Sequence, residues 1–100
     1  MEVKINSVHF NVDQKLNDFV NKKVGKLDTF FDGIIRADVT LKVAKPETAN
    51  NKVAELRLST PAMDNLFAKK QADSFEEAVD LTIDAVKKQI DKYKEKLKNK

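Results

Sequence analysis

Positive charge is concentrated at the C-terminal end of the chain. Seven of the nineteen Lys and Arg residues lie in the last sixteen positions, at Lys87, Lys88, Lys92, Lys94, Lys96, Lys98 and Lys100. Only Asp91 and Glu95 oppose them, so residues 85–100 carry a formal charge of +5. Residues 1–84 hold twelve bases and fourteen acids, a formal charge of −2. A polyanion is the partner that this basic segment favours.

Apolar residues predict that the basic segment is helical. Spacings of four and three place Val79, Ile83, Val86, Ile90, Tyr93 and Leu97 on one side of a helix, which leaves the lysines facing outward. Acids near the start of a helix and bases near its end also match the helix dipole, which is a purely structural explanation. That explanation requires one or two cations in the last turn, whereas seven bases here span about four turns. We therefore favour phosphate binding.

A second basic group lies on the predicted first helix, at Lys22, Lys23 and Lys26. Taken alone, such a run is most often a solvated helix face. If the two helices lie side by side, however, these lysines extend the basic surface of the last helix. Lys69 and Lys70, on the last predicted strand, are a third and weaker candidate.

The residue types needed for catalysis or metal binding are scarce. The chain has no cysteine, two glycines and a single histidine, His9, which excludes a thiol nucleophile, a His-pair metal site and a Gly-rich phosphate loop. Asp80 and Asp84 share one helical face and could form an acid–base pair, but their position favours pairing with nearby lysines. We expect no enzyme activity, no cofactor, no metal and no small-molecule substrate.

Hydrophobic patterning predicts the elements that position these lysines. We expect strands at about residues 2–7, 37–43, 54–59 and 66–71, turns at 45–51 and 61–65, and helices at 14–31 and 75–97. Asp13 and Ser74 are the expected N-caps, and Asp32-Gly33 is the expected end of the first helix. The last three strands should pair antiparallel. The order β-α-β-β-β-α predicts an α+β two-layer sandwich, with both helices on one face of a four-stranded sheet.

The length of 100 residues predicts a single domain over residues 1–100, with residues 98–100 frayed. The start of the chain lacks the apolar run of a signal peptide, and no stretch approaches the roughly 20 apolar residues of a membrane span. We therefore expect a cytoplasmic protein without a membrane partner.

Three segments in order resemble one protein family. The run Lys23-Val24-Gly25-Lys26-Leu27-Asp28-Thr29-Phe30-Phe31-Asp32 resembles the "K-x-x-K-L-x-x-[YF]-F-D" segment of the ribosome hibernation-promoting factors, also known as sigma-54 modulation or ribosome-associated inhibitor proteins. The strand Val39–Val43 follows at the corresponding place. Ala78-Val79-Asp80, Ile83-Asp84 and the run from Lys88 to Leu97 are similar to "A-I-D…D-K-L-x-R-Q-L-x-K-x-K-x-K". The resemblance covers essentially the whole chain.

The resemblance implies a fold like that of double-stranded-RNA-binding domains. It also implies a non-enzymatic protein that binds ribosomal RNA in the mRNA and tRNA channel of the small ribosomal subunit. Ribosomes so occupied are inactive in translation, as in stationary phase. The family's RNA contacts carry over to Lys23, Lys26, Lys88, Gln89, Lys92, Lys94 and Lys96, and the charge pattern adds Lys22 and Lys87.

The chain also departs from the family pattern. Ala85 stands where a lysine is common, although Lys87 could compensate, and Ser74-Phe75-Glu76 replaces Asp-Met-Tyr. The chain resembles the short form of the family. Two alternatives stay open, a free double-stranded RNA-binding module and a protein–protein modulator of a transcription factor. The second would use Glu76, Asp80 and Asp84 or the outer face of the sheet.

Overall fold

The computed structural model describes residues 1–45, 47–61 and 66–98, with side chains as far as Glu95 in the last helix. Its elements are β1 (Glu2–Val8), α1 (Gln14–Gly25), α2 (Leu27–Phe30), β2 (Arg36–Val43), β3 (Lys52–Ser59), β4 (Leu66–Ala72) and α3 (Phe75–Lys98). This order confirms the predicted α+β class, and each predicted strand is present within two residues of its expected ends.

The four strands form one mixed sheet in the order β1-β2-β3-β4. β2, β3 and β4 pair antiparallel, as predicted, and Val39 lies opposite Leu56. β1 runs parallel to β2, with Val3 opposite Ala37. Parallel neighbours need a crossover rather than a tight turn, and the segment containing α1 and α2 supplies it.

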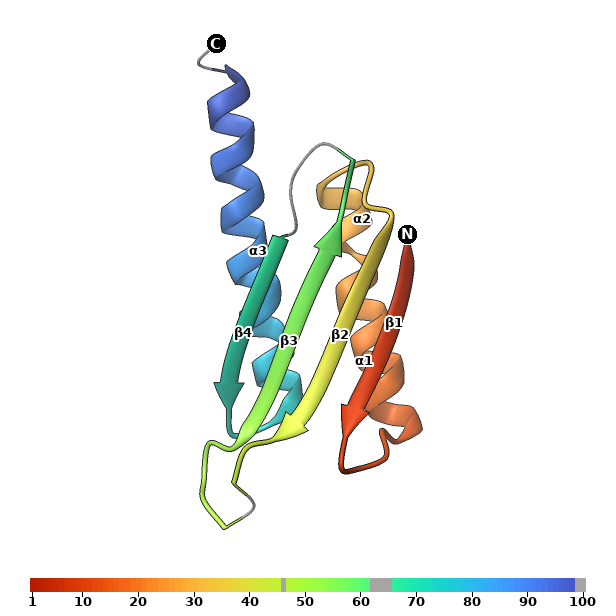
Figure 1. Cartoon of the computed structure of the whole chain (residues 1–100). Helices are drawn as coiled ribbons and strands as arrows, with labels where there is room; N and C mark the ends of the chain where they lie inside the picture. Colours follow the sequence, from red (N-terminus) through yellow and green to blue (C-terminus); the bar gives the residue numbers. More distant parts are fainter. Residues whose placement is uncertain (46, 62–65, 99–100) are drawn as a thin grey trace.

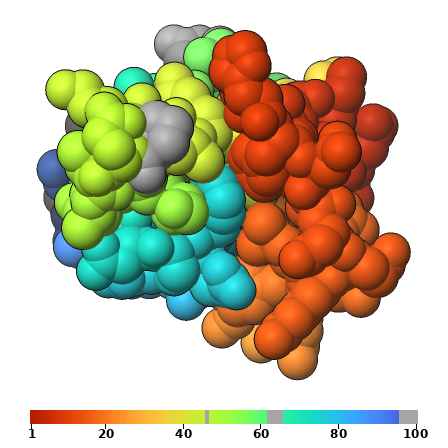
Figure 2. Space-filling model, turned by 90° about the horizontal axis from the view of Figure 1, so that it is seen from below, coloured from red at the N-terminus to blue at the C-terminus, as the bar shows by residue number. Residues whose placement is uncertain are grey.

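Both helical segments cover the same face of the sheet (Figure 1). α3 packs on β3 and β4, while α1 packs on β1. Seen from below, α1 and the first turns of α3 lie side by side (Figure 2). The predicted two-layer arrangement is therefore confirmed, and no helix among the described residues lies on the opposite face of the sheet.

The core lies between these two layers. Every second side chain of β2 and β3 points toward the helices, and the helix residues that pack against them are spaced three and four apart. Fully buried members are Val20, Val24, Leu27, Ala37, Leu41, Ala54, Leu56, Leu58, Ala78, Val79, Val86 and Ile90. Burial of each large side chain contributes roughly 1.5–3 kcal/mol. The predicted apolar stripe of the last helix is therefore buried as far as Ile90, while Tyr93 is half-buried.

The prediction of one continuous helix over residues 14–31 is wrong. Asp13 caps α1 as expected, because its carboxylate accepts the Leu16 N–H at 2.8 Å. α1 ends at Gly25, however, and α2 begins at Leu27 after a one-residue interruption at Lys26. Glycine is a poor helix former, since ordering its backbone costs more entropy than ordering that of other residues. α2 then ends at Phe30, three residues before Gly33, which adopts the expected left-handed conformation at φ +94°.

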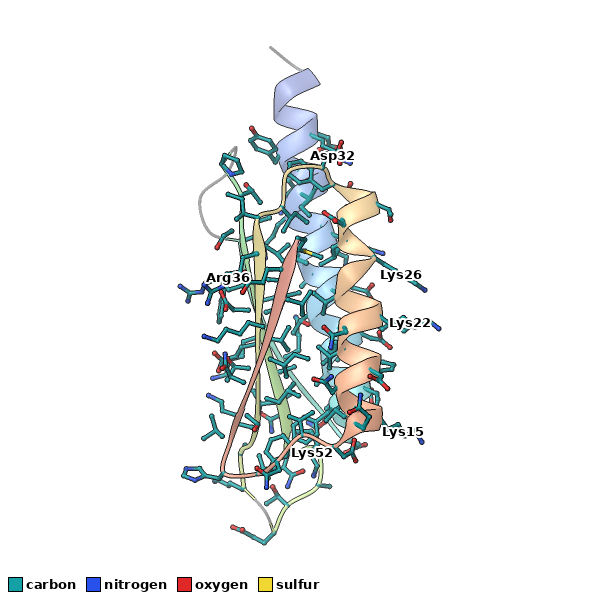
Figure 3. All side chains as sticks on the ribbon, turned by 90° about the vertical axis from the view of Figure 1, so that its right-hand side faces the viewer. Lys15, Lys22, Lys26, Asp32, Arg36 and Lys52 are labelled. Atoms are coloured by element: carbon teal, nitrogen blue, oxygen red, sulfur yellow. The ribbon has the colours of Figure 1, made fainter. Side chains whose placement is uncertain are left out.

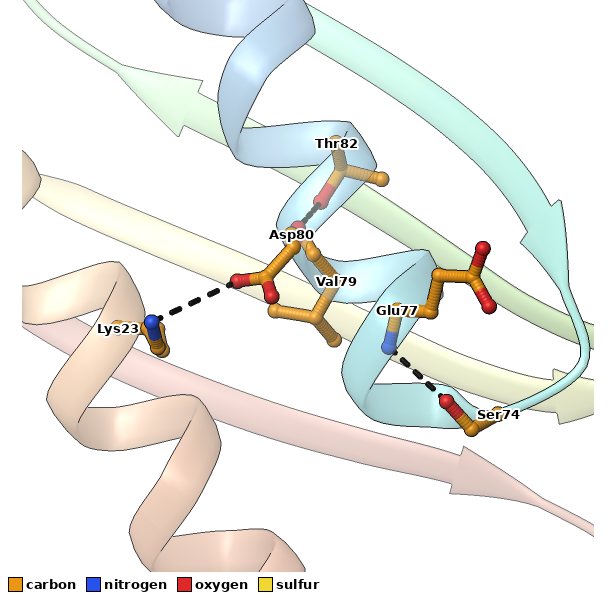
Figure 4. A network of polar contacts seen from close by, with 6 residues as sticks. All are labelled: Lys23, Ser74, Glu77, Val79, Asp80 and Thr82. Atoms are coloured by element: carbon orange, nitrogen blue, oxygen red, sulfur yellow. Dashed lines mark hydrogen bonds and ion pairs between the residues drawn. The ribbon is translucent and has the colours of Figure 1, made fainter.

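The start of α3 agrees with the predicted cap. The Glu77 N–H donates to the Ser74 hydroxyl oxygen at 3.1 Å (Figure 4). α3 runs to Lys98, one residue beyond its expected end. Lys98, the first residue of the predicted frayed tail, therefore belongs to the helix. The other two tail residues, 99–100, lie outside the described residues, as do residues 46 and 62–65 of the predicted turns.

Candidate nucleic-acid interface

A shallow groove between α1 and α3 brings together lysines from both helices. Lys23 and Lys26 line it from the first segment and Lys87 from α3, over an apolar floor of Leu27 and Ile83. Two carboxylates, Asp80 and Asp84, also line it. We call these seven residues the inter-helix groove. Its existence confirms the side-by-side placement on which the merging of the two basic groups depends.

The inter-helix groove contains one direct pairing of opposite charges. Lys23 Nζ lies 4.0 Å from Asp80 Oδ1, and these side chains are 39% and 50% exposed (Figure 4). Lys23 also lies 5.7 Å from the centre of the Phe19 ring. An ion pair this long and this exposed stabilises the fold by no more than about 1 kcal/mol. Lys23 can therefore exchange Asp80 for a phosphate at little energetic cost.

Further along α3, two lysines lie against the aromatic end of α2. Lys94 Nζ is 4.6 Å from the centre of the Phe30 ring and donates to the Phe30 carbonyl at 3.2 Å. Lys87 Nζ lies 5.3 Å from the same ring. Phe31 meets Tyr93 edge-to-face at 6.5 Å between ring centres. These contacts hold both ammonium groups at the junction of α2 and α3.

The other flank of α3 forms a second basic groove, against β4. It contains Lys70, Leu81, Asp84, Ala85, Lys88, Gln89 and Lys92, which we call the β4 groove. Gln89 is fixed there, because its amide donates to the Phe67 carbonyl at 2.9 Å. Lys88 and Lys92 are exposed, and neither makes an ion pair with any carboxylate that the structure describes. They are available to anions in solution.

The family model of sigma 54 modulation proteins and S30EA ribosomal proteins matches residues 3–98. The chain belongs to this family. The match covers all of the elements from α1 to α3 and most of β1, so the two basic grooves lie inside the family region.

Members of the family with curated names include several ribosome hibernation promoting factors. The chain is 30% identical over 96 residues to that of Pseudomonas putida, covering 96% of this chain and 89% of the relative. It is 30% identical over 98 residues to that of Escherichia coli, covering 98% of each. The Bacillus subtilis ribosome hibernation promotion factor is 29% identical, and 52% of its length is matched.

Solved structures share the fold at lower identity. The N-terminal domain of Thermus thermophilus Protein Y superposes with a TM-score of 0.76 at 22% identity, over 93% of this chain and 99% of that one. A ribosomal subunit interface protein from Coxiella burnetii gives a TM-score of 0.81 at 19% identity, over 94% and 98%. Both likenesses show that solved structures share the fold described above.

The structure divides the predicted RNA-binding residues among three places. Lys23, Lys26, Lys87 and Lys94 lie on the α1–α2 side of α3, whereas Lys88, Gln89 and Lys92 lie on the β4 side. Lys22 points away from the sheet, on the outer side of α1 (Figure 3). The Lys96 side chain lies outside the described residues. The lysines therefore form two groups that flank α3, with Asp84 lining both grooves.

Two further lysines extend these groups. Lys15 points outward on the same side of α1 as Lys22 and Lys26 (Figure 3). Lys15 precedes Lys22 by seven residues, which is about two helical turns, so the sequence already indicates that both lie on one helix face. Lys15 was not among the residues predicted from the sequence. Lys70, a weaker candidate from the sequence, lines the β4 groove. Only the pairing of β4 with β3 and the packing of α3 on both strands reveal that proximity.

Within the described residues, no group of three or more His, Asp or Glu side chains is arranged to hold a metal ion. The same part of the chain contains no helix that is both long and apolar enough to cross a membrane. The polar side chains of the two grooves are lysines, Gln89 and the carboxylates of Asp80 and Asp84.

Proposed function

We propose that this protein is a ribosome hibernation factor that binds ribosomal RNA in the mRNA and tRNA channel of the small subunit. Its bound form inhibits translation by occupying that channel in stationary phase. Membership of the family and the names of its relatives support the ribosome as partner. The proposed mechanism needs no catalysis, because a molecule that fills the channel excludes mRNA and tRNA sterically.

The observation that carries this proposal is the availability of the lysines. Of the seven candidate lysines with described side chains, only Lys23 lies within 4.0 Å of a described carboxylate. The rest keep their charge for a partner. Phosphates supply most protein–RNA affinity and position the protein on the backbone.

Placement of the lysines on both flanks of α3 favours folded RNA. The major groove of A-form RNA is too narrow for side-chain readout, so recognition depends on backbone shape. A helix with bases on two sides can contact phosphates from two RNA segments at once. The folded ribosomal RNA that surrounds a channel presents phosphates in that way. We expect little dependence on base identity.

The test is equilibrium binding to purified small subunits, measured by co-sedimentation over a range of salt concentrations. We expect Lys88→Gln and Lys92→Gln each to weaken binding and to reduce the steepness of the log–log salt dependence by about one. Lys45→Gln is the matched control, since it removes the same charge from an exposed turn at the far end of the sheet. Absence of co-sedimentation at low salt would overturn the proposal.

Occupancy of the channel is tested separately, by displacement of labelled mRNA and tRNA from small subunits. We expect stoichiometric protein to displace both, and co-binding would contradict the channel site. An excess of duplex RNA is included as competitor, because a free double-stranded RNA-binding module would be titrated by it. A transcription-factor modulator would instead keep its binding after charge reversal at Lys88 and Lys92.

A further inference from the structure

The face of the sheet opposite the helices is uncovered and has its own chemistry. Arg36 points from this face away from the helical layer (Figure 3). A shallow hollow crosses all four strands, lined among others by Asn6 of β1, Thr40 of β2, Arg57 of β3 and Phe67 of β4. We call this surface the open sheet face. Of the side chains on this face used below, the sequence offered only Lys69, as a weaker candidate for phosphate binding.

An exposed aromatic platform lies in this hollow. Phe67 is 39% exposed, although it lies on a strand where an outward polar residue would be expected. Arg57 lies directly opposite it on β3, and the guanidinium carbon is 5.2 Å from the centre of the ring. A phenyl ring beside a guanidinium plane is a surface on which an unpaired base can stack.

The charges around this platform are predominantly positive. Asp38 is neutralised by Arg36 at 2.8 Å, and Glu55 by Lys42 at 2.8 Å. The side-chain hydrogen bond to Asp38, together with the negative charge of that carboxylate, raises the pKa of Arg36 above its usual value. Lys4, Arg57 and Lys69, by contrast, have no carboxylate within 4.0 Å among the residues that the structure describes. Bound phosphates would meet unpaired cations.

The width of the sheet along one row of paired residues limits how many nucleotides this face can bind. Lys4 pairs with Asp38, Asp38 with Arg57, and Arg57 with Phe67, so one row crosses the sheet from β1 to β4. Three strand spacings span about 14 Å. Stacked nucleotides rise about 3.4 Å each along one strand, so this row accommodates roughly two to four nucleotides.

We propose that the open sheet face binds a short unpaired RNA segment, with one base stacked on Phe67 and Arg57. Lys4 and Lys69 contact its phosphates, and the Asn6 amide and Thr40 hydroxyl lie in the same hollow as hydrogen-bonding groups for base edges. This site is separate from the helical lysines and lies on the other side of the molecule. A protein bound through both surfaces would lie between two RNA elements.

The test uses the whole chain and fluorescently labelled single-stranded hexauridylate, with binding followed by anisotropy at low salt. We expect Phe67→Leu and Arg57→Gln to weaken binding about fivefold or more, because stacking of one base is lost. Lys88→Gln, on the opposite side, should have a smaller effect. Urea unfolding of each variant shows whether its fold is retained.

Amide chemical shifts of the unmodified protein give a readout that does not depend on variants. Addition of hexauridylate should shift the amides of Arg57, Phe67 and Lys69 more than those of α1 and α3. Three results would overturn the proposal: no binding of hexauridylate, shifts confined to the helices, or unchanged affinity in the Phe67 variant. Tighter binding of a poly-glutamate peptide with the same Phe67 dependence would also overturn it, since the site would then be one for acidic peptides.

Discussion

The candidate lysines differ in how firmly neighbouring residues hold their side chains. Lys94 is held by the ring and the carbonyl of Phe30, while Lys88 and Lys92 extend into solvent without a described ion pair. An immobilised side chain loses less conformational entropy when it binds a phosphate than a mobile one does. The side chains held near α2 are therefore better organised for a fixed RNA contact, and those of the β4 groove can adapt to the partner.

Removal of the Asp80 charge should strengthen RNA binding. Asp80→Asn releases Lys23 and removes a carboxylate that repels phosphates from the inter-helix groove. We expect severalfold tighter binding to small subunits, with the free energy of unfolding changed by less than about 1 kcal/mol. Titration of small subunits and urea unfolding measure the two quantities.

The control for that experiment is Glu47→Gln, in the exposed turn between β2 and β3. It makes the same change in net charge at a residue that lines neither basic groove. Equal strengthening by the two substitutions would mean that only net charge matters. Weaker binding of Asp80→Asn would show that the carboxylate positions Lys23 for its contact.

For the first helical segment, α1 and α2, the hydrophobic pattern predicts the buried side of the helix but not the break within it. Val24, Leu27 and Phe30 follow at steps of three, so the apolar stripe continues through the interruption at Lys26. Periodicity indicates which side of the chain faces the sheet, and that was predicted correctly. It carries no information about whether each backbone hydrogen bond of the helix forms, so the break was missed.

The two glycines should respond oppositely to the same substitution. Gly25 closes α1 without a positive φ, and a methyl group there would meet no atom within 4 Å. Gly25→Ala should therefore raise the free energy of unfolding by about 0.5–1 kcal/mol. Gly33 has φ +94°, so Gly33→Ala should lower it by roughly 1–2 kcal/mol. Urea unfolding of both variants measures the difference, and equal signs would contradict this assignment.

The sequence indicates which lysines the two helices carry but not how the fold divides them between two grooves, and their role in RNA binding stays a prediction. Charge and spacing placed lysines on two helices, and the structure brings Lys23, Lys26 and Lys87 into one groove. The separation of Lys87 from Lys88 onto different flanks depends on where α3 crosses the sheet. The contact between Arg57 and Phe67 depends on the register of β3 against β4. Both are tertiary facts, which local patterns do not contain.

For the whole molecule, the source of stability differs from the source of the proposed affinity. The core is apolar, and in each of the four ion pairs between described residues at least one partner is 35% or more exposed. Salt screens exposed charges strongly and leaves apolar burial nearly unchanged. Folding and RNA binding should therefore respond differently to ionic strength.

A tenfold rise in salt concentration should separate the two processes. If about five to seven lysines neutralise phosphates, the log–log slope of ribosome affinity is about −4 to −6, a loss of roughly four to six orders of magnitude. We expect the free energy of unfolding to change by less than about 1 kcal/mol over the same range. Co-sedimentation and urea unfolding in matched buffers measure both. A shallow slope for binding would point to an apolar interface instead.

The 24 residues of α3 are about 36 Å long, whereas strands of seven or eight residues span about 25 Å. α3 therefore extends past the sheet at its C-terminal end (Figure 1), in a body measuring 50 × 23 × 17 Å. One tip of the molecule is thus a lone rod about 10–12 Å thick, and the other is the full double layer. If the protein enters a narrowing passage, as proposed above, the thin end fits first and the double layer does not, so the shape of the molecule favours one direction of insertion.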